Sequence, residues 1–264
     1  MPIAIIQGSG DVGSAVAHQL TLEGFQAIIV DDIAPAHARR GMSFVDAFYE
    51  GSALLSSVKA RYTDDISFTG AQEVLVSSLD VAKLLTQLSV GLVIDARMRK
   101  RMLPELPAWK AQHQALLIGL GPGFEVGNNC DLAIETAWGG SLGESVRSST
   151  KALAGHPKPI DGYTRERIVY APQAGQWNTQ FNVGDVVKAG EVLGDIEAQI
   201  ITAPLSGRLR GISHGNAQVS KAQKIIEIDP SHLEQIYGIG ERPMKIAQGI
   251  IKALHKKVGR TKHD

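Results

Sequence analysis

The chain has 264 residues, enough for two modest domains that each bury a hydrophobic core. Its 27 Lys and Arg balance 27 Asp and Glu, so the formal net charge is zero and neither a nucleic acid nor an anionic membrane is an expected partner. A single cysteine, Cys130, excludes an internal disulfide and a cysteine metal cluster, and no metal site is predicted. The N-terminus lacks the pattern of a signal peptide, and its apolar run is too short to span a bilayer. We therefore expect a cytoplasmic protein.

The opening stretch has the order strand, glycine loop, helix, strand. An apolar, β-rich run over residues 2–7 leads into GSGDVG, where Gly8, Gly10 and Gly13 have G-x-G-x-x-G spacing. A helical pattern and a second strand follow, and that strand ends in two acids, the second of which is Asp32. This order is the fingerprint of a dinucleotide-binding fold.

Each of the three glycines has its own physical role in such a fold. The first permits a tight turn, the second lets the backbone approach a pyrophosphate, and the third lets the helix pack on the strand. Free N–H groups at the helix start would face the phosphates. The predicted cofactor-binding residues of this loop are Gly8, Ser9, Gly10, Asp11, Val12 and Gly13.

Asp32 lies 19 residues after Gly13, where a ribose-binding carboxylate is expected. An acid there repels a 2′-phosphate, so NAD is the predicted cofactor rather than NADP. Arg39 and Arg40 leave NADP open as an alternative, because their side chains could reach its 2′-phosphate or could simply be solvated. A degenerate fold that kept its packing glycines and lost its ligand is a further alternative.

Strands and helices continue to alternate. Strand patterns over residues 72–78, 91–98 and 113–124 are separated by helical ones such as residues 78–88. Alternation of this kind predicts a Rossmann-like, doubly wound parallel sheet, whose ligands bind at the carboxyl ends of its strands.

Two segments at predicted strand ends carry further candidates. DARMRKR supplies Asp95 and Lys100, which could meet an anionic substrate or belong to a solvated basic turn. GLGPGFEVGNN supplies Gly119, Gly121 and Gly123, whose amides could face an anion or cofactor or form only a tight turn. Glu135 stands in an apolar run, as a helix-surface residue or a buried functional carboxylate. Asp95, Lys100 and Glu135 are therefore the catalytic acid/base candidates.

The second part of the chain contains an internal repeat. APQAG at Ala171 recurs as APLSG at Ala203, an offset of 32 residues, and residues 187–197 align with 219–229 at the same offset. Two copies of a short β motif predict two interlocked halves with one core. The pattern is similar to the barrel-sandwich hybrid fold of biotinyl and lipoyl domains. Gln199 and Ile200 are predicted to form the turn of the hairpin, where those domains carry their modified lysine, so no swinging-arm role and no covalent cofactor is expected.

The tail from residue 241 reads as an amphipathic helix whose apolar face favours packing on the chain itself over binding a partner. The predicted domains are a nucleotide-binding domain over residues 1–155, a barrel-sandwich hybrid module over 156–232, and a C-terminal helix and tail over 233–264.

Phrases along nearly the whole chain resemble one family. They are IIQGSGDVGSAVAHQL, RRGMSFVDAFYEG, VIDARMRK, LIGLGPGFEVGNNCDLAIETAWG, GYTRERIVYAPQAG, VGDVVKAGEVLGDIE and ITAPLSGRLRG. They are similar to the accessory family of the selenium-dependent molybdenum hydroxylase system, the YqeB type. The resemblance implies a Rossmann-type domain followed by a β module. It also implies a role in maturing molybdenum hydroxylases of the xanthine dehydrogenase type, with nucleotide binding at Gly8, Gly10, Gly13 and Asp32.

Three functions follow, in this order. The first is an accessory protein that binds NAD(H) and assists maturation of a hydroxylase or its molybdenum cofactor. The second is a non-catalytic docking protein with the β module as adaptor. The third is an NAD-dependent oxidoreductase acting on a small substrate. Whether the chain is an enzyme stays open, as do its partner, a hydroxylase or a maturation protein, and its assembly into a homo-oligomer.

Overall fold

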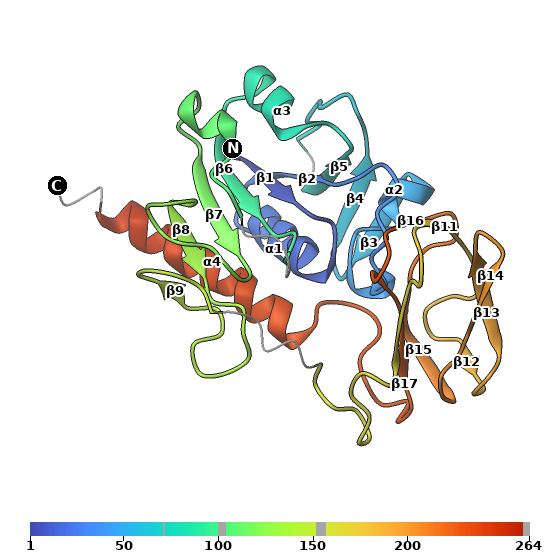
Figure 1. Cartoon of the computed structure of the whole chain (residues 1–264). Helices are drawn as coiled ribbons and strands as arrows, with labels where there is room; N and C mark the ends of the chain where they lie inside the picture. The colour runs from blue at the N-terminus through green and yellow to red at the C-terminus, as the bar shows by residue number, and fades with distance from the viewer. Residues whose placement is uncertain (71, 100–103, 152–156, 261–264) are drawn as a thin grey trace.

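The computed structural model describes residues 1–70, 72–99, 104–151 and 157–260. It is an α/β protein with one large mixed sheet and two smaller antiparallel sheets (Figure 1). No helix in these residues combines the length and apolar character that crossing a membrane requires.

The first part of the chain builds the large sheet and its helices. In chain order its elements are β1 (Ile3–Gln7), α1 (Asp11–Leu22), β2 (Gln26–Val30), the 3-10 turn η1 (Arg40–Met42), α2 (Ala47–Glu50), β3 (Ser52–Leu55), β4 (Val58–Tyr62), β5 (Glu73–Ser77), α3 (Val81–Gln87), β6 (Val90–Asp95), the 3-10 turn η2 (Ala108–Ala111), β7 (Leu116–Leu120), β8 (Leu132–Ile134) and β9 (Ser145–Val146).

The strand order of the large sheet is β3-β4-β5-β2-β1-β6-β7-β8-β9. The strands from β4 to β8 run parallel, and β3 and β9 pair antiparallel at the two edges. From β1 the chain builds the sheet first on the β2 side and later on the β6 side. The order therefore reverses beside β1, where ligands bind in open α/β sheets.

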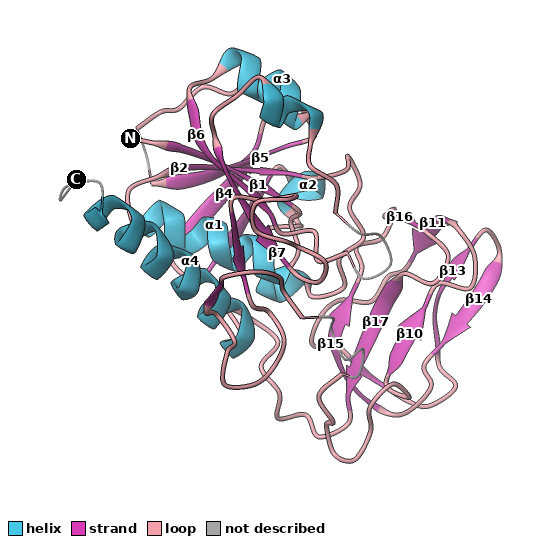
Figure 2. Cartoon of the chain, turned by 60° about the vertical axis from the view of Figure 1, so that its left-hand side comes forward, coloured by secondary structure: helices cyan, strands magenta, loops and turns pink. Residues whose placement is uncertain are grey.

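Alternate residues of each strand supply two core layers. Ile6 and Ile29 face α1, whereas their neighbours Ile5 and Ile28 face α3. Figure 2 shows α3 on one side of the sheet and α1 with the last helix, α4 (Glu241–Arg260), on the other.

The last helix belongs with the large sheet. Ile246 and Ile250 are fully buried in the core layer that contains α1. A side chain on Gly249 would overlap the carbonyl oxygen of Gly143, so only glycine allows this close contact. In Figure 1, α4 follows the β strands on the right of the view and runs back along α1 toward the left.

The strands that follow β9 and precede α4 form a β module of two sheets. Its strands are β10 (Ile168–Tyr170), β11 (Gly175–Asn178), β12 (Val186–Val187), β13 (Val192–Ile196), β14 (Gln199–Thr202), β15 (Gly207–Ile212), β16 (Gln218–Val219) and β17 (Lys224–Asp229). One sheet has the order β10-β17-β15-β12 and the other β14-β13-β11-β16.

The module contains the 32-residue repeat in its strand order. β11 and β15 start at Gly175 and Gly207, 32 residues apart, and β10, β12 and β13 have counterparts β14, β16 and β17 at matching positions. Replacing each strand of one sheet by its counterpart gives the order of the other sheet. Each sheet thus takes two strands from each copy, and the shared core surrounds the fully buried Trp177.

The hairpin between β13 and β14 differs in detail from the sequence prediction. Its turn is formed by Glu197 and Ala198, with φ of 49° and 67°, whereas Gln199 and Ile200 already belong to β14. A two-residue turn with both φ values positive matches the twist of the flanking strands. The exposed Ile200 side chain therefore lies on a strand, not on the turn.

Candidate functional site

Parallel strands place the predicted residues along one edge of the large sheet. The carboxyl ends of β1, β2, β6, β7 and β8, with the residues that follow them, carry the predicted residues. In the same order these are the loop Gly8–Gly13, the pair Asp31 and Asp32, the region from Asp95, the glycines from Gly119, and Glu135.

The glycine loop joins β1 to α1 by a tight turn. Gly8 has φ of +102°, and its N–H donates to the carbonyl oxygen of Val30 at 2.8 Å. A side chain on Gly13 would overlap the carbonyl oxygen of Gly8. Close contact between the helix and the strand end therefore requires Gly13 to be glycine.

Asp31, one residue before the predicted Asp32, is the carboxylate from the end of β2 that contacts this loop. Its Oδ2 accepts hydrogen bonds from the N–H of Ser9 at 2.6 Å and from the Ser9 hydroxyl at 2.7 Å. The Nε2 of His37 lies 2.9 Å from the same oxygen. Burial raises the pKa of Asp31, but the hydrogen bonds from His37 and Ser9 outweigh burial and lower it to about 2. Asp32 bonds to Asp31 through its own N–H, at 2.9 Å.

His37 covers the second glycine of the loop. A Cβ built on Gly10 would lie 3.1 Å from Nδ1 of His37, so the ring packs against the Gly10 backbone. Burial opposes a charge on the ring, but Asp31 outweighs burial and raises the pKa of His37. Spacing gives no signal for this contact, because His37 belongs to an irregular segment after β2.

Arg39 and Arg40 are both engaged within the protein. Nη1 of Arg39 donates to Asp11 Oδ2 at 2.9 Å, at the first residue of α1, and Nε and Nη2 of Arg39 donate to Glu227 in β17, each at 3.1 Å. The buried Arg40 donates to Asp46 at 2.6 Å. Either arginine would have to leave a carboxylate to reach a phosphate.

Glu227 accepts from four cations at once. Besides Arg39, the donors are Arg167 at 2.8 Å, Arg210 at 2.7 Å and Lys224 at 2.8 Å. Burial raises the pKa of Glu227, but Lys224 and the arginines outweigh it and hold the pKa well below its usual range. Glu227 is not among the site residues predicted from the sequence. Its position inside the apolar run IIEID could have indicated a buried carboxylate.

The predicted acid/base residues have the following surroundings. Asp95 is 5% exposed and accepts from Nε of Arg97 at 3.0 Å and from Nη2 of Arg99 at 2.9 Å. Glu135 is 1% exposed and accepts from the backbone N–H groups of residues 136, 137 and 151 at 2.8, 2.8 and 3.0 Å. Lys100 lies outside the described residues. Both described carboxylates therefore have strong internal partners.

The second glycine segment is shaped by packing. A side chain on Gly119 would overlap the ring of Phe124, and one on Gly121 would lie 3.3 Å from the sulfur of Met98. Gly121 and Gly123 have φ of +103° and +83°, which side chains disfavour. These values describe a tight turn, and the three glycines keep their cofactor role as a prediction.

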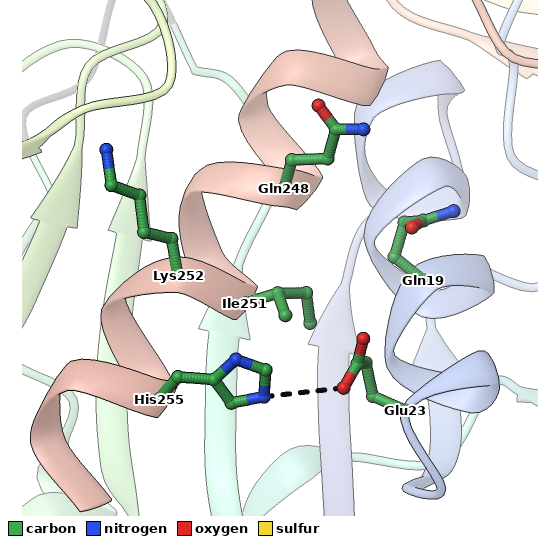
Figure 3. Close-up of a pocket in the computed structure, with 6 residues that line it drawn as sticks. All are labelled: Gln19, Glu23, Gln248, Ile251, Lys252 and His255. Atoms are coloured by element: carbon green, nitrogen blue, oxygen red, sulfur yellow. Dashed lines mark ion pairs between the residues drawn. The ribbon is translucent and has the colours of Figure 1, made fainter. Parts of the chain in front are cut away.

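Two surface hollows lie along α4, away from the glycine loop. One, of about 450 Å³, is drawn in Figure 3 between α4 and the C-terminal half of α1, where His255 pairs with Glu23 at 3.4 Å. The other, of about 420 Å³, lies between α4 and residues 139–144. Within the described part of the chain, no three His, Cys, Asp or Glu side chains are grouped to hold a metal ion.

Comparisons with known proteins give a strong sequence match to a bacterial protein. No family model matches the chain. It is 31% identical over 258 residues to "Uncharacterized protein YqeB" of Escherichia coli (strain K12), covering 96% of this chain and 47% of that protein. The chain thus spans about half the length of this relative. A solved aspartoacylase family protein from Mesorhizobium loti aligns with 89% of this chain and 86% of its own, at 17% identity and a TM-score of 0.26, too low to support an argument about fold or function.

Proposed function

We propose that the chain binds a dinucleotide of the NAD(H) type at the Gly8–Gly13 loop and acts as an accessory protein in hydroxylase maturation. The observation that carries the binding proposal is the glycine geometry at the reversal of strand order. Gly8 turns tightly and Gly13 admits the helix, so α1 begins directly beyond β1. Helix starts of this kind favour the phosphates of dinucleotides.

The residues present fit such a ligand in part. The start of α1 would hold the pyrophosphate, and Asp31, rather than Asp32, is the better-supported ribose ligand because it lies on the loop. Its negative charge favours NAD(H) over NADP(H). His37 occupies the space beside Gly10, so it would have to move for the pyrophosphate to approach that backbone. When bound, the nicotinamide would supply hydride-transfer capacity.

We also propose a fold type for each of the two parts of the molecule. The order of the parallel strands supports a Rossmann-like, doubly wound sheet. The interleaved repeat supports a barrel-sandwich hybrid module of the biotinyl and lipoyl type, without a lysine on the hairpin between β13 and β14.

The maturation role rests on the family phrases and on the 31% identity across nearly the whole chain. Under this proposal the partner is a molybdenum hydroxylase of the xanthine dehydrogenase type, or a protein that matures its cofactor, in the cytoplasm. The docking alternative keeps support from the compact β module. The oxidoreductase alternative has less, because Asp95 and Glu135 already bind arginines and backbone amides.

Ligand-dependent melting tests the binding proposal. A dinucleotide at 100 times its Kd should stabilise the protein by about 2.7 kcal/mol. Gly10→Glu should abolish the shift, because it places a charge beside the phosphates and a side chain against His37. Gly140→Glu is the control, since a side chain there would meet no atom within 4 Å of its Cβ. The proposal fails if neither NAD(H) nor NADP(H) changes the melting temperature and mass spectrometry finds no co-purifying nucleotide.

A further inference from the structure

A short segment separates the glycine loop from the β module. We call residues 34–39, which follow β2, the strap. His37 contacts the loop, whereas Ala36 and Ala38 contact the module. Arg39 contacts both, because it bonds to Asp11 at the start of α1 and to Glu227 in β17.

On the loop side, the strap covers the backbone that the proposed ligand requires. The ring of His37 packs on Gly10 and bonds to Asp31, whose carboxylate in turn occupies the N–H of Ser9. Arg39 holds Asp11 at the first residue of α1. A pyrophosphate needs close approach to the second glycine of the fingerprint, and in this structure a side chain fills that place.

On the module side, the strap is held along its length. Ala36 is buried in the core of the module, and its carbonyl oxygen accepts from Nε2 of Gln223 at 3.0 Å. The carbonyl oxygen of Ala34 accepts from the N–H of Gln218 at 3.3 Å. A Cβ on Gly211 would lie 2.8 Å from the carbonyl oxygen of Ala38, so the two backbones touch.

We propose that the strap is a gate over the glycine loop, closed here by a latch that consists of His37 and Asp31. The identity of the ligand rests on the proposed function. A dinucleotide binds only to molecules in which His37 has left Gly10, so its apparent affinity falls with the fraction of open molecules. The backbone of the strap is bonded to the β module, which holds His37 in the position that closes the gate.

Two measurements on four proteins test the gate. The proteins are the wild type, His37→Ala, His37→Gln and His255→Ala. The glutamine variant can still donate to Asp31 and cover Gly10. His255→Ala is the matched control, because it removes a histidine–carboxylate pair with Glu23 at the other end of α1 (Figure 3). The measurements are hydrogen exchange of the Ser9 amide without nucleotide, and the Kd for NADH.

We expect His37→Ala to speed Ser9 exchange and tighten NADH binding, each at least five-fold, which corresponds to about 1 kcal/mol. At about pH 6, the other two variants should behave like the wild type. Unchanged exchange in His37→Ala overturns the latch, whatever the nucleotide data show. Faster exchange with unchanged NADH affinity overturns the gate. Faster exchange with no NADH binding by any of the four proteins supports the latch and rejects the dinucleotide of the proposed function.

Discussion

Arg39 and Glu227 lie 188 residues apart in the chain and share two hydrogen bonds of 3.1 Å. The same guanidinium reaches Asp11, so one side chain joins the start of α1 to the last strand of the β module. The contact between the two parts of the molecule therefore has an ionic centre. Removing its central carboxylate takes the ion-pair partner from the buried Arg167 and the half-buried Lys224, while Arg39 keeps Asp11.

Glu227→Gln should destabilise the protein by about 3–5 kcal/mol, because it breaks a buried ion-pair network from one side. Urea unfolding measures this loss. The control is Glu191→Gln, an exposed position in the same module, where a change within about 0.5 kcal/mol is expected. Equal effects at the two positions would show that the network adds little.

Stability should fall in acid. The pKa values of Glu227 and Asp31 in the folded protein lie below those of ordinary carboxyl groups, so both carboxylates stabilise the protein at neutral pH. That contribution is lost as the pH falls from about 5 toward 2. For Asp31, the lowering of the pKa from 3.8 to about 2 corresponds to about 2 kcal/mol. Urea unfolding of Asp31→Asn should show a shallower loss than the wild type over this range, and parallel curves would contradict the prediction.

The latch should weaken in base. The pKa of His37 is raised from 6.5, and the carboxylates that face the ring are Asp31, Asp11 and Asp32. A raised pKa stabilises the folded, latched form below the unfolded value, and this contribution is lost as the pH rises through the folded value. NADH should therefore bind more tightly at about pH 9 than at about pH 6. His37→Gln should remove this pH dependence of NADH affinity. If the variant shows the same dependence as the wild type, another group is responsible.

Gly249→Ala should destabilise the protein, against the usual trend. Within an exposed helix this change stabilises by about 1 kcal/mol. At Gly249 the new methyl group would overlap the carbonyl oxygen of Gly143 and lift α4 from its place. Thermal unfolding should show a lower Tm, with Gly91→Ala as control because a Cβ there would have no atom within 4 Å. An unchanged Tm would mean that the helix can shift at little cost.

Local patterns predict the parts of the fold that depend on neighbouring residues. The glycine loop and the repeat are visible because turn geometry and period are properties of a short stretch. Asp31 is displaced by one residue from the expected Asp32 because β2 ends at Val30, and element ends are weakly encoded. The hairpin turn is displaced toward Glu197 and Ala198 for the same reason.

Contacts between distant segments could not be predicted. The packing of His37 on Gly10 depends on an irregular segment, and the pairing of Arg39 with Glu227 depends on how the module docks. The apolar run around Glu135 indicates burial of its carboxylate as one alternative. It does not indicate that three backbone N–H groups bind that carboxylate.

The pairing of β10 with β17 has a consequence for how this chain could be rebuilt. The chain enters the module at β10 and leaves it at β17, and Ile168 pairs with Glu227 between these strands. The two points of attachment are therefore neighbours, and α4 completes the first core only after the module has been traversed. In engineering terms the module is a cassette inserted into a loop before the final helix. A short linker in place of the residues from β10 to β17 should leave the large sheet and its helices able to fold.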